Sequence, residues 1–430
     1  MKLLQLISLS TVIIHVNSSP ISFFNLFKKS DELEELSTGP ITPQRNESFV
    51  LNGTNSTTGS TGQNSTNSTS STSNSKPNIL LYSFSNDFTK LYESNSSSTN
   101  SNLSISAAEL SNILYNSNQG TNGNSTAQNS NFQSTILKNS LSKIANISYQ
   151  DISNVSSSDF NSTYLLKLYY TLNETIESNP PDGIVILQDF SNIETSAFFL
   201  DLVLNSSIPI ILTTEPTSQN FLTNGVSNLY DSVLVATNSS DFVNQGTLVV
   251  SDKKITSGFY SIPVSTNLGN SIDSSPQGLL GQIYEGKIQW FYESIDLTSD
   301  FNFTFTKETD SLPNILILEN GQGRLNLEII DFLEQNDDLS GLIITSQTST
   351  PEFNSQIQDK ISELSKKIPV VITTDTPNGG SISPNDLSLG STIAGGILDS
   401  VKAKVLLQLC VNSKYDLDEI KHNFESAYGG

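Results

Sequence analysis

Short, continuous apolar runs recur along this chain of 430 residues, and each ends in a polar or turn-forming stretch. Uninterrupted runs of this length are typical of parallel strands that are buried on both faces of a sheet. Helical patterns lie between several of the runs, for example over 325–335 and 354–367. The apolar runs span 77–84, 183–187, 208–212, 232–236, 247–250, 314–318, 341–344 and 369–373. This alternation predicts an α/β fold built from βαβ units with parallel sheets.

A change of composition at Pro77 divides the chain. Residues 46–76 consist almost entirely of Ser, Thr, Asn and Gly, so they have little to bury and are expected to stay extended. We assign 19–76 to a disordered low-complexity segment, 77–305 to a larger N-terminal α/β domain and 312–430 to a smaller C-terminal α/β domain. A polar region over 94–132 predicts a long loop with a short helix near 107–115.

Two helices are predicted at the C-terminus. The first carries an apolar stripe of Leu398, Val401, Val405 and Leu409. In the second, Asp416 is placed to cap the helix and Glu419 to complete a capping box. Cys410 lies on the apolar stripe, which predicts a buried structural thiol rather than a catalytic one.

The N-terminus has the pattern of a secretory signal peptide over 1–18. An apolar stretch follows Lys2, and Val16 and Ser18 are small enough for the positions before a cleavage site. No later run reaches about 18 apolar residues, so we expect no membrane anchor and a protein that is secreted, extracellular or held in a cell wall. The basic pair Lys28-Lys29 is either a solvated charge pair or a processing site.

Asn-x-Ser/Thr acceptor sites are dense, which supports an extracellular glycoprotein. They begin at Asn46, Asn52, Asn55, Asn64, Asn67, Asn95, Asn102, Asn124, Asn146, Asn154, Asn161, Asn173, Asn205, Asn238 and Asn302.

Charge and histidine use exclude several functions. A net charge of −22 argues against a nucleic-acid partner, because phosphate contacts need clustered Lys and Arg. His422 is the single histidine after the signal-like segment, and its charged surroundings predict a surface position. Sites of the Ser-His-Asp or Cys-His type and zinc sites would lack the ligands that they need, so we expect no metal and no cofactor.

Several framework segments together resemble the bacterial-type L-asparaginases, over about 77–428. These are "GIVILQDFSNIETSAFFLDLVLNSSIPIIL" (183–212), "NGVSNLYDSVLVAT" (224–237), "SPQGLLGQIYEGKI" (275–288), "IPVVITT" (368–374) and "GGILDSVKAKVLLQLCVNSKYDLDEIKHNF" (395–424). The resemblance implies a larger N-terminal and a smaller C-terminal α/β domain, in agreement with the layout above. It also implies a homo-oligomer, because the family's sites lie at subunit interfaces, although glycans at Asn205, Asn238 and Asn302 could cover the assembly surface.

The family's chemistry uses a T-G-G-T loop after the first strand and a T-H-G-T-D-T loop after the strand corresponding to 183–187. In this sequence the first nucleophile position falls on Asp87, or on Thr89 after a register slip, and the second Thr and Asp positions fall on Phe190 and Ser191. The family's lysine position falls on Pro263. Its substrate-carboxylate pair Ser-Gln becomes Tyr149-Gln150, which keeps the Gln.

These changes predict a protein that is not an enzyme, because loss of one member of a catalytic unit typically costs about 10³-fold or more. A carboxylate pair of Asp87 and Asp189 is an alternative site, although acidic residues on polar turns are usually helix caps. The expected mature start "SPISFFNLFKKS" and the tract "NGTNSTTGSTG" are similar to the N-termini of yeast secreted wall-related glycoproteins induced by starvation and of their relatives in spore-wall maturation. We therefore expect a non-catalytic, wall-associated glycoprotein linked to nutrient limitation, stress or sporulation, with wall polysaccharide or wall proteins as partners. The alternatives are a secreted amidohydrolase acting on asparagine or a related amide, and an amino-acid-binding module.

Overall fold

The computed structural model describes residues 75–84 and 141–427, apart from internal gaps. The gaps are 154, 156, 215–223, 239–245, 267–269, 275–277, 292–300, 302, 304, 307, 322, 377–380 and 388. The chain divides into two compact units, 1–72 and 73–430, and the first lies outside the described residues. The predicted signal peptide, the low-complexity segment up to residue 74, the helix near 107–115 and Asp87 lie outside the described residues.

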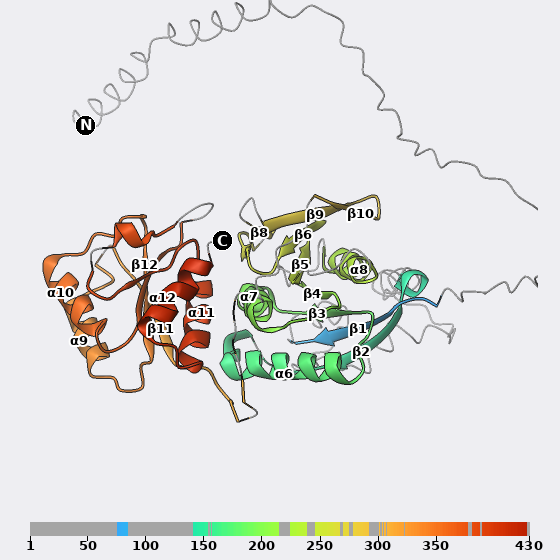
Figure 1. Cartoon of the computed structure of the whole chain (residues 1–430). Helices are drawn as coiled ribbons and strands as arrows, with labels where there is room; N and C mark the ends of the chain where they lie inside the picture. Colours follow the sequence, from blue (N-terminus) through green and yellow to red (C-terminus); the bar gives the residue numbers. More distant parts are fainter. Residues whose placement is uncertain are drawn as a thin grey trace, which may run out of the picture. The chain divides into compact units, whose positions relative to one another are not determined.

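The larger sheet has eight strands in the order β10-β9-β6-β5-β4-β3-β1-β2 (Figure 1). Its parallel part comprises β1 (Asn78–Ser83), β2 (Asn146–Asp151), β3 (Gly183–Leu187), β4 (Ile210–Thr213) and β5 (Thr247–Ser251). Its antiparallel part comprises β6 (Lys254–Ser257), β9 (Leu279–Tyr284) and β10 (Lys287–Trp290). A separate antiparallel pair is formed by β7 (Ser261–Pro263) and β8 (Ile272–Ser274).

Helices cover both faces of this sheet, since its central strands are apolar on both sides. On one face lie α6 (Ser162–Ser178) and α7 (Ile193–Val203), whose side chains join a core cluster with Ile184, Ile186 and Leu212. On the other face lies α8 (Asn224–Ala236), which packs on a second cluster with Val185 and Leu187 (Figure 1). Short 3-10 helices precede α6 and α7, at η2 (Ser157–Asp159) and η3 (Phe190–Asn192).

The smaller sheet is parallel, in the order β11-β12-β13-β14. Its strands are β11 (Ile315–Glu319), β12 (Gly341–Ser346), β13 (Val370–Thr374) and β14 (Ile393–Ala394). The helices around it are α9 (Leu327–Glu334), α10 (Ser355–Leu364), η7 (Pro384–Asp386), α11 (Ser400–Asn412) and α12 (Leu417–Ser426).

The predicted α/β class with parallel sheets is confirmed, and seven of the eight apolar runs form strands. The run over 232–236 was predicted with the strands but lies inside α8. Five apolar residues cannot by themselves distinguish a strand from a buried helical turn, and Val233, Val235 and Ala236 are buried in the helix instead. The division at 305–312 stays a prediction.

The helix α11 is buried more completely than its apolar stripe predicts. It contacts α7 as well as β11, β12 and β13, so side chains on several of its faces, including Lys402 and Gln408, are buried. The predicted capping box of α12 is confirmed: Asp416 accepts from the Glu419 amide at 2.9 Å, and Glu419 accepts from the Asp416 amide at 2.8 Å.

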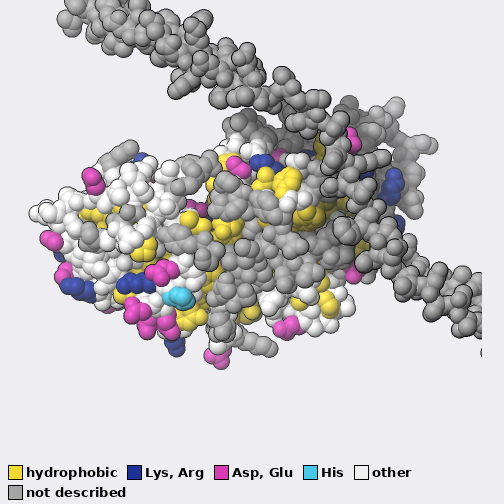
Figure 2. All heavy atoms as spheres, turned by 45° about the horizontal axis from the view of Figure 1, so that its top comes forward, with side chains coloured by type: hydrophobic (Ala, Val, Ile, Leu, Met, Phe, Trp, Pro, Cys, Tyr) yellow, Lys and Arg dark blue, Asp and Glu magenta, His cyan; other side chains and the backbone are white. Residues whose placement is uncertain are grey.

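No described helix combines the length and the apolar composition that crossing a bilayer requires. On the face drawn in Figure 2, the described Lys and Arg side chains are scattered among Asp and Glu rather than gathered in one patch.

Candidate functional site

The carboxyl ends of the parallel strands bring polar residues to one edge of the larger sheet. Ser83 ends β1, Gln188 follows β3, Thr214 follows β4 and Ser251 ends β5. All four are buried. This edge is where open parallel α/β sheets bind ligands, because the loops that leave the strands meet there.

The turn between β3 and α7 has a local reason for its shape. Asp189 is the N-cap of η3 and accepts from the Ser191 amide at 3.2 Å. Phe190 is half-buried and packs against the core cluster beneath α6 and α7, whereas Ser191 is exposed. Asp189 therefore shapes the turn, and Phe190 fastens it to the core.

Two buried side chains at this edge have polar atoms without hydrogen-bond partners. They are Gln188, through both Nε2 and Oε1, and Thr214, through Oγ1. The two residues are 1% and 0% exposed. An unsatisfied buried polar atom costs about 1–3 kcal/mol, so three of them at neighbouring positions call for an explanation.

The neighbouring polar groups are already paired. Asn228 of α8 donates from Nδ2 to the Thr214 carbonyl at 3.0 Å and to Ser251 Oγ at 3.3 Å, and its Oδ1 accepts from the Asp252 amide at 3.0 Å. The Thr213 hydroxyl donates to the Val250 carbonyl at 2.8 Å. These bonds fix the ends of β4 and β5 but leave the Thr214 hydroxyl unused.

A second hydrogen-bonded group lies at the ends of β1 and β2. Ser83 is in register with Asp151, and the Tyr149 hydroxyl donates to Asp151 Oδ1 at 2.6 Å. The Ser83 hydroxyl also hydrogen-bonds to Tyr149. Burial, together with the bond to Asp151, raises the pKa of Tyr149 well above its ordinary value, so the phenol stays protonated. A serine hydroxyl, a neutral phenol and a carboxylate thus form a chain along which protons can move.

Glu194, which follows the turn, meets two ionisable side chains from the start of α11, the buried Lys402 and the partly exposed Asp399. Lys402 of α11 donates from Nζ to Glu194, in the first turn of α7, and to Asp399 Oδ2 at 2.7 Å. Only 4% of the Lys402 side chain is exposed. Burial raises the pKa of Glu194 to about 8, although the positive charge of Lys402 acts to lower it. Burial also opposes the ionisation of Asp399, yet the Lys402 ammonium holds the pKa of that carboxyl below its ordinary value. At neutral pH, Lys402 therefore pairs with the Asp399 carboxylate while Glu194 carries a proton.

The structure brings together four of the residues that the resemblance singled out. Tyr149 and Gln150 lie near the end of β2, and Phe190 and Ser191 follow β3 at the same edge. Pro263 ends β7 in the separate two-stranded sheet, and Asp87 is outside the described residues.

The sequence analysis did not single out Gln188, Thr214, Glu194 or Lys402. The signal for Gln188 and Thr214 was a polar residue directly after a buried apolar run. The signal for Lys402 was a lysine within an otherwise apolar helical stretch.

Other sequence-based expectations can also be located. Cys410 is fully buried, and burial raises the pKa of its thiol to about 12, as expected for a structural cysteine. His422 is exposed on α12. Asn146, Asn161 and Asn205 are exposed, and whether any acceptor asparagine carries a glycan stays a prediction.

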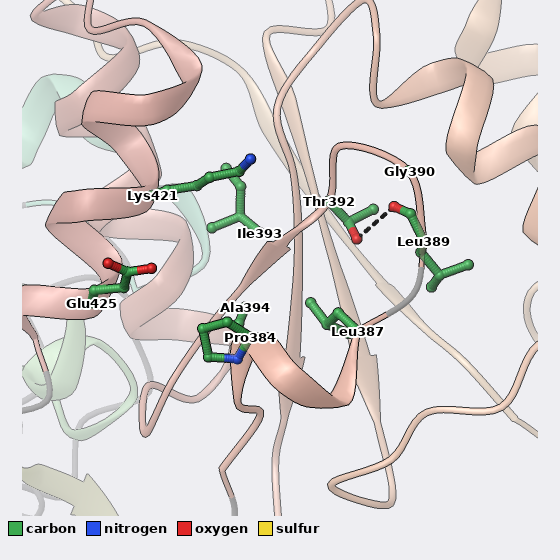
Figure 3. Close-up of a pocket in the computed structure, with 9 residues that line it drawn as sticks. All are labelled: Pro384, Leu387, Leu389, Gly390, Thr392, Ile393, Ala394, Lys421 and Glu425. Carbon is green, nitrogen blue, oxygen red and sulfur yellow. Dashed lines mark hydrogen bonds between the residues drawn. The ribbon is translucent and has the colours of Figure 1, made fainter.

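A separate hollow of about 190 Å³ lies between η7, β14 and α12 (Figure 3). Lys421 and Glu425 lie on one side of it, and the Thr392 hydroxyl within it donates to the Leu389 carbonyl at 2.8 Å. Within the described part of the chain, no His, Cys, Asp and Glu side chains group into a potential metal site. The sheet edge remains the stronger candidate for chemistry.

The larger sheet is covered by helices on both faces and carries polar residues at the carboxyl edge of its parallel part, which defines an α/β protein of the class that binds ligands at this edge. Residues 116–296 match the family model described as "Asparaginase, N-terminal". The chain is 30% identical over 301 residues to L-asparaginase 2-3 of Saccharomyces cerevisiae, a match that covers 68% of this chain and 80% of the relative. L-asparaginase 2 of Bacillus subtilis is 27% identical over 288 residues, covering 66% and 75%.

The fold has a solved counterpart. The crystal structure of a probable cytoplasmic L-asparaginase from Campylobacter jejuni matches with a TM-score of 0.66 and 22% identity, covering 81% of this chain and 99% of that chain. The chain belongs to the asparaginase family.

The expectation that the protein is not an enzyme is wrong. Its relatives in yeast and bacteria are named as L-asparaginases, which points to an enzyme. That expectation was based on four motif positions, whereas the similarity extends over about two thirds of the chain.

Proposed function

We propose that this chain is an amidohydrolase that releases ammonia from L-asparagine or a related side-chain amide. The observation that carries the proposal is the 30% identity over 301 residues to a protein named L-asparaginase. The buried polar edge of the larger sheet supports it, because its unpaired amide and hydroxyl groups suit a small polar substrate.

The catalytic groups in this proposal are those at the ends of β1 and β2. Ser83 Oγ attacks the amide carbonyl carbon while its proton passes to Tyr149, which gives its own proton to Asp151. The reverse transfer protonates the leaving nitrogen, so ammonia departs and an ester remains on Ser83. Water then hydrolyses the ester to the carboxylic acid, with the same chain of groups moving the proton.

Ammonia release from L-asparagine and L-glutamine by the purified, glycosylated protein tests the proposal. We expect turnover of about 1 s⁻¹ or more, an ordinary enzymatic rate. Tyr149→Phe should lower kcat at least about tenfold, because it breaks the link between Ser83 and Asp151. The matched control is Tyr170→Phe, which removes a phenol bonded at 2.8 Å to the Thr306 carbonyl, and it should leave kcat unchanged. Stabilisation by asparagine without any ammonia release would overturn the proposal.

The same proposal includes an extracellular location. The signal-like segment over 1–18 and the dense acceptor sites support a secreted glycoprotein, and the wall resemblance supports a role at the cell wall under nutrient limitation, stress or sporulation. Polysaccharide or protein of the wall is the partner that we propose. Recovery of a glycosidase-sensitive form from culture medium or wall extracts tests this part, and an intracellular, unglycosylated chain would contradict it.

A further inference from the structure

The hairpin of β9 and β10 lies at one edge of the larger sheet and has one uncovered face (Figure 1). Its inner face joins the core cluster beneath α8, through Leu280, Ile283, Ile288 and Trp290. Strand alternation puts the remaining side chains on the opposite face, which we call the outer face. The outer face consists of five exposed side chains: Gln282, Tyr284, Lys287, Gln289 and Phe291. The hairpin is therefore held by the core on one side and open to solvent on the other.

Two aromatic rings lie at the ends of the outer face. Tyr284 is 59% exposed and Phe291 is 48% exposed. Tyr284 is the cross-strand partner of Lys287, and Phe291 lies four residues after Lys287 in the chain. At about 3.3–3.4 Å per residue, the two aromatic side chains are about 13 Å apart along the strands. Two exposed rings on one small, rigid surface are suited to a ligand that has apolar faces of its own.

Two amide side chains lie between the rings. Gln282 and Gln289 are cross-strand partners, and Gln282 Nε2 donates to Gln289 Oε1 at 3.4 Å. This bond leaves the Gln282 carbonyl oxygen and the Gln289 N–H groups available to a ligand. The outer face thus presents a ring, a hydrogen-bonding pair and a second ring in sequence, and Lys287 is the one charged residue among the five.

A chain of sugar rings has the matching chemistry. The faces of a pyranose ring carry C–H groups that pack on aromatic rings, and its rim carries hydroxyls that both donate and accept hydrogen bonds. A β-linked chain is extended, so its successive rings can reach from Tyr284 to Phe291. A neutral chain is favoured, because a protein with a net charge of −22 repels polyanions. We propose that the outer face binds a neutral, β-linked polysaccharide. This inference rests on the wall location in the proposed function, since it names the chemistry of the wall partner and the surface that binds it.

The size of the outer face argues against a protein as its occupant. Two strands about 4.8 Å apart, over a length of about 13 Å, offer an area on the order of 100–200 Å². A stable protein interface buries about 800 Å² on each partner. Pairing of β10 with a strand of a second copy is also disfavoured, because a lysine on an edge strand such as Lys287 opposes edge-to-edge association.

The experiment measures binding of the purified, full-length glycoprotein to insoluble cellulose, chitin and β-1,3-glucan, by its depletion from solution. We expect wild type to bind at least one of these neutral polymers, and to bind it more tightly than the polyanion alginate. Tyr284→Ala and Phe291→Ala should each lower the binding constant at least about fivefold, or about 1 kcal/mol for a lost ring contact. The double variant should lose measurable binding, whereas Tyr284→Phe keeps the ring and should bind as wild type does. The matched control is Phe332→Ala, which removes a more exposed ring from α9 and should leave binding unchanged.

Four results would overturn the inference. They are a folded wild type that binds none of the three neutral polymers, binding that the double variant retains, equal binding to alginate, and a wild-type dimer that the double variant dissociates in analytical ultracentrifugation. The last result would show that a second copy occupies the outer face. The substituted side chains are exposed, so we expect the variants to fold, and circular dichroism checks this.

Failure of the proposed function is distinguishable from failure of this inference. Ring-dependent polymer binding without ammonia release would remove the hydrolysis and keep the polysaccharide site. Ammonia release without polymer binding would keep the hydrolysis and remove the polysaccharide site.

Discussion

Glu194→Gln tests the buried charges that join α7 to α11. The change keeps the size of the side chain and both of its contacts, since Gln can accept from Lys402 and donate to Asp399. It removes the proton that Glu194 takes up or loses. The variant should therefore resemble protonated wild type at every pH.

The magnitude follows from the pKa of Glu194, which burial raises from 4.5 to about 8 in the folded protein. Between these values the folded state binds more protons than the unfolded state. The stabilisation is therefore complete below pH 4.5 and is lost as the pH rises towards 8. The loss is at most about 1.4 kcal/mol per pH unit, or up to about 4 kcal/mol between pH 5 and pH 8. Asp399, whose pKa is lowered, changes its protonation at a lower pH than this range, and Lys402, whose pKa is raised, changes its protonation at a higher pH. Neither group therefore titrates in the range where Glu194 does.

Urea denaturation followed by circular dichroism at pH 5, 6, 7 and 8 measures the effect. Burial also raises the pKa of Asp231, so the informative quantity is the difference between wild type and variant rather than either slope alone. The difference should be near zero at pH 5 and should grow with pH in favour of Glu194→Gln. In the control Glu334→Gln, a near-surface side chain loses its negative charge but can still accept from Lys367. The pKa of Glu334 is lowered by its lysine neighbours, so this group does not titrate between pH 5 and pH 8 and the pH slope should match that of wild type. Equal slopes for wild type and Glu194→Gln would refute the reasoning.

Three further predictions concern buried groups. Lys402→Met leaves the acidic side chains of Glu194 and Asp399 facing each other without their cation. In urea denaturation at pH 8, the free energy of unfolding should fall by about 3–5 kcal/mol. A loss below about 1 kcal/mol would contradict a stabilising role of Lys402 between the two acids. Asn228→Ala removes three hydrogen bonds at the ends of β4 and β5. The free energy of unfolding should fall by about 2 kcal/mol in the same assay. An unchanged urea midpoint would show that these bonds do not contribute to stability. Cys410 should react with a thiol reagent at least about a hundredfold more slowly in the native protein than in urea, because its thiol is buried with a pKa of about 12; equal rates would place it at the surface.

Local patterns predicted the regular elements where the local signal was strong. The run over 183–187 forms a buried parallel strand, and Asp416 with Glu419 forms the capping box, because both depend on neighbours in the chain. The run over 232–236 failed as a strand because five apolar residues fit either element. The antiparallel strands β6, β9 and β10 were not predicted, since their pairing depends on partners distant along the chain.

The candidate site was predicted in its location but not in its chemistry. The resemblance placed the family's second loop directly after the strand over 183–187, and the structure shows that this turn lies at the carboxyl edge of the larger sheet. Attention to the family's hydroxyl positions led to Phe190 and Ser191, and from them to the wrong expectation that the protein is not an enzyme. Gln188 was passed over, because its burial depends on how the strands and helices pack around it.

The amino-acid sequence by itself determined the α/β class, the main parallel strands and the capping box of α12, because apolar runs and capping side chains act over a few residues. The tertiary structure alone decided that Gln188 and Thr214 share one level of the sheet and that Lys402 meets Glu194. Gln188 and Thr214 are 26 positions apart in the chain, and Glu194 and Lys402 are 208 positions apart. Strand register and helix packing bring them together, and both depend on contacts that no local pattern encodes.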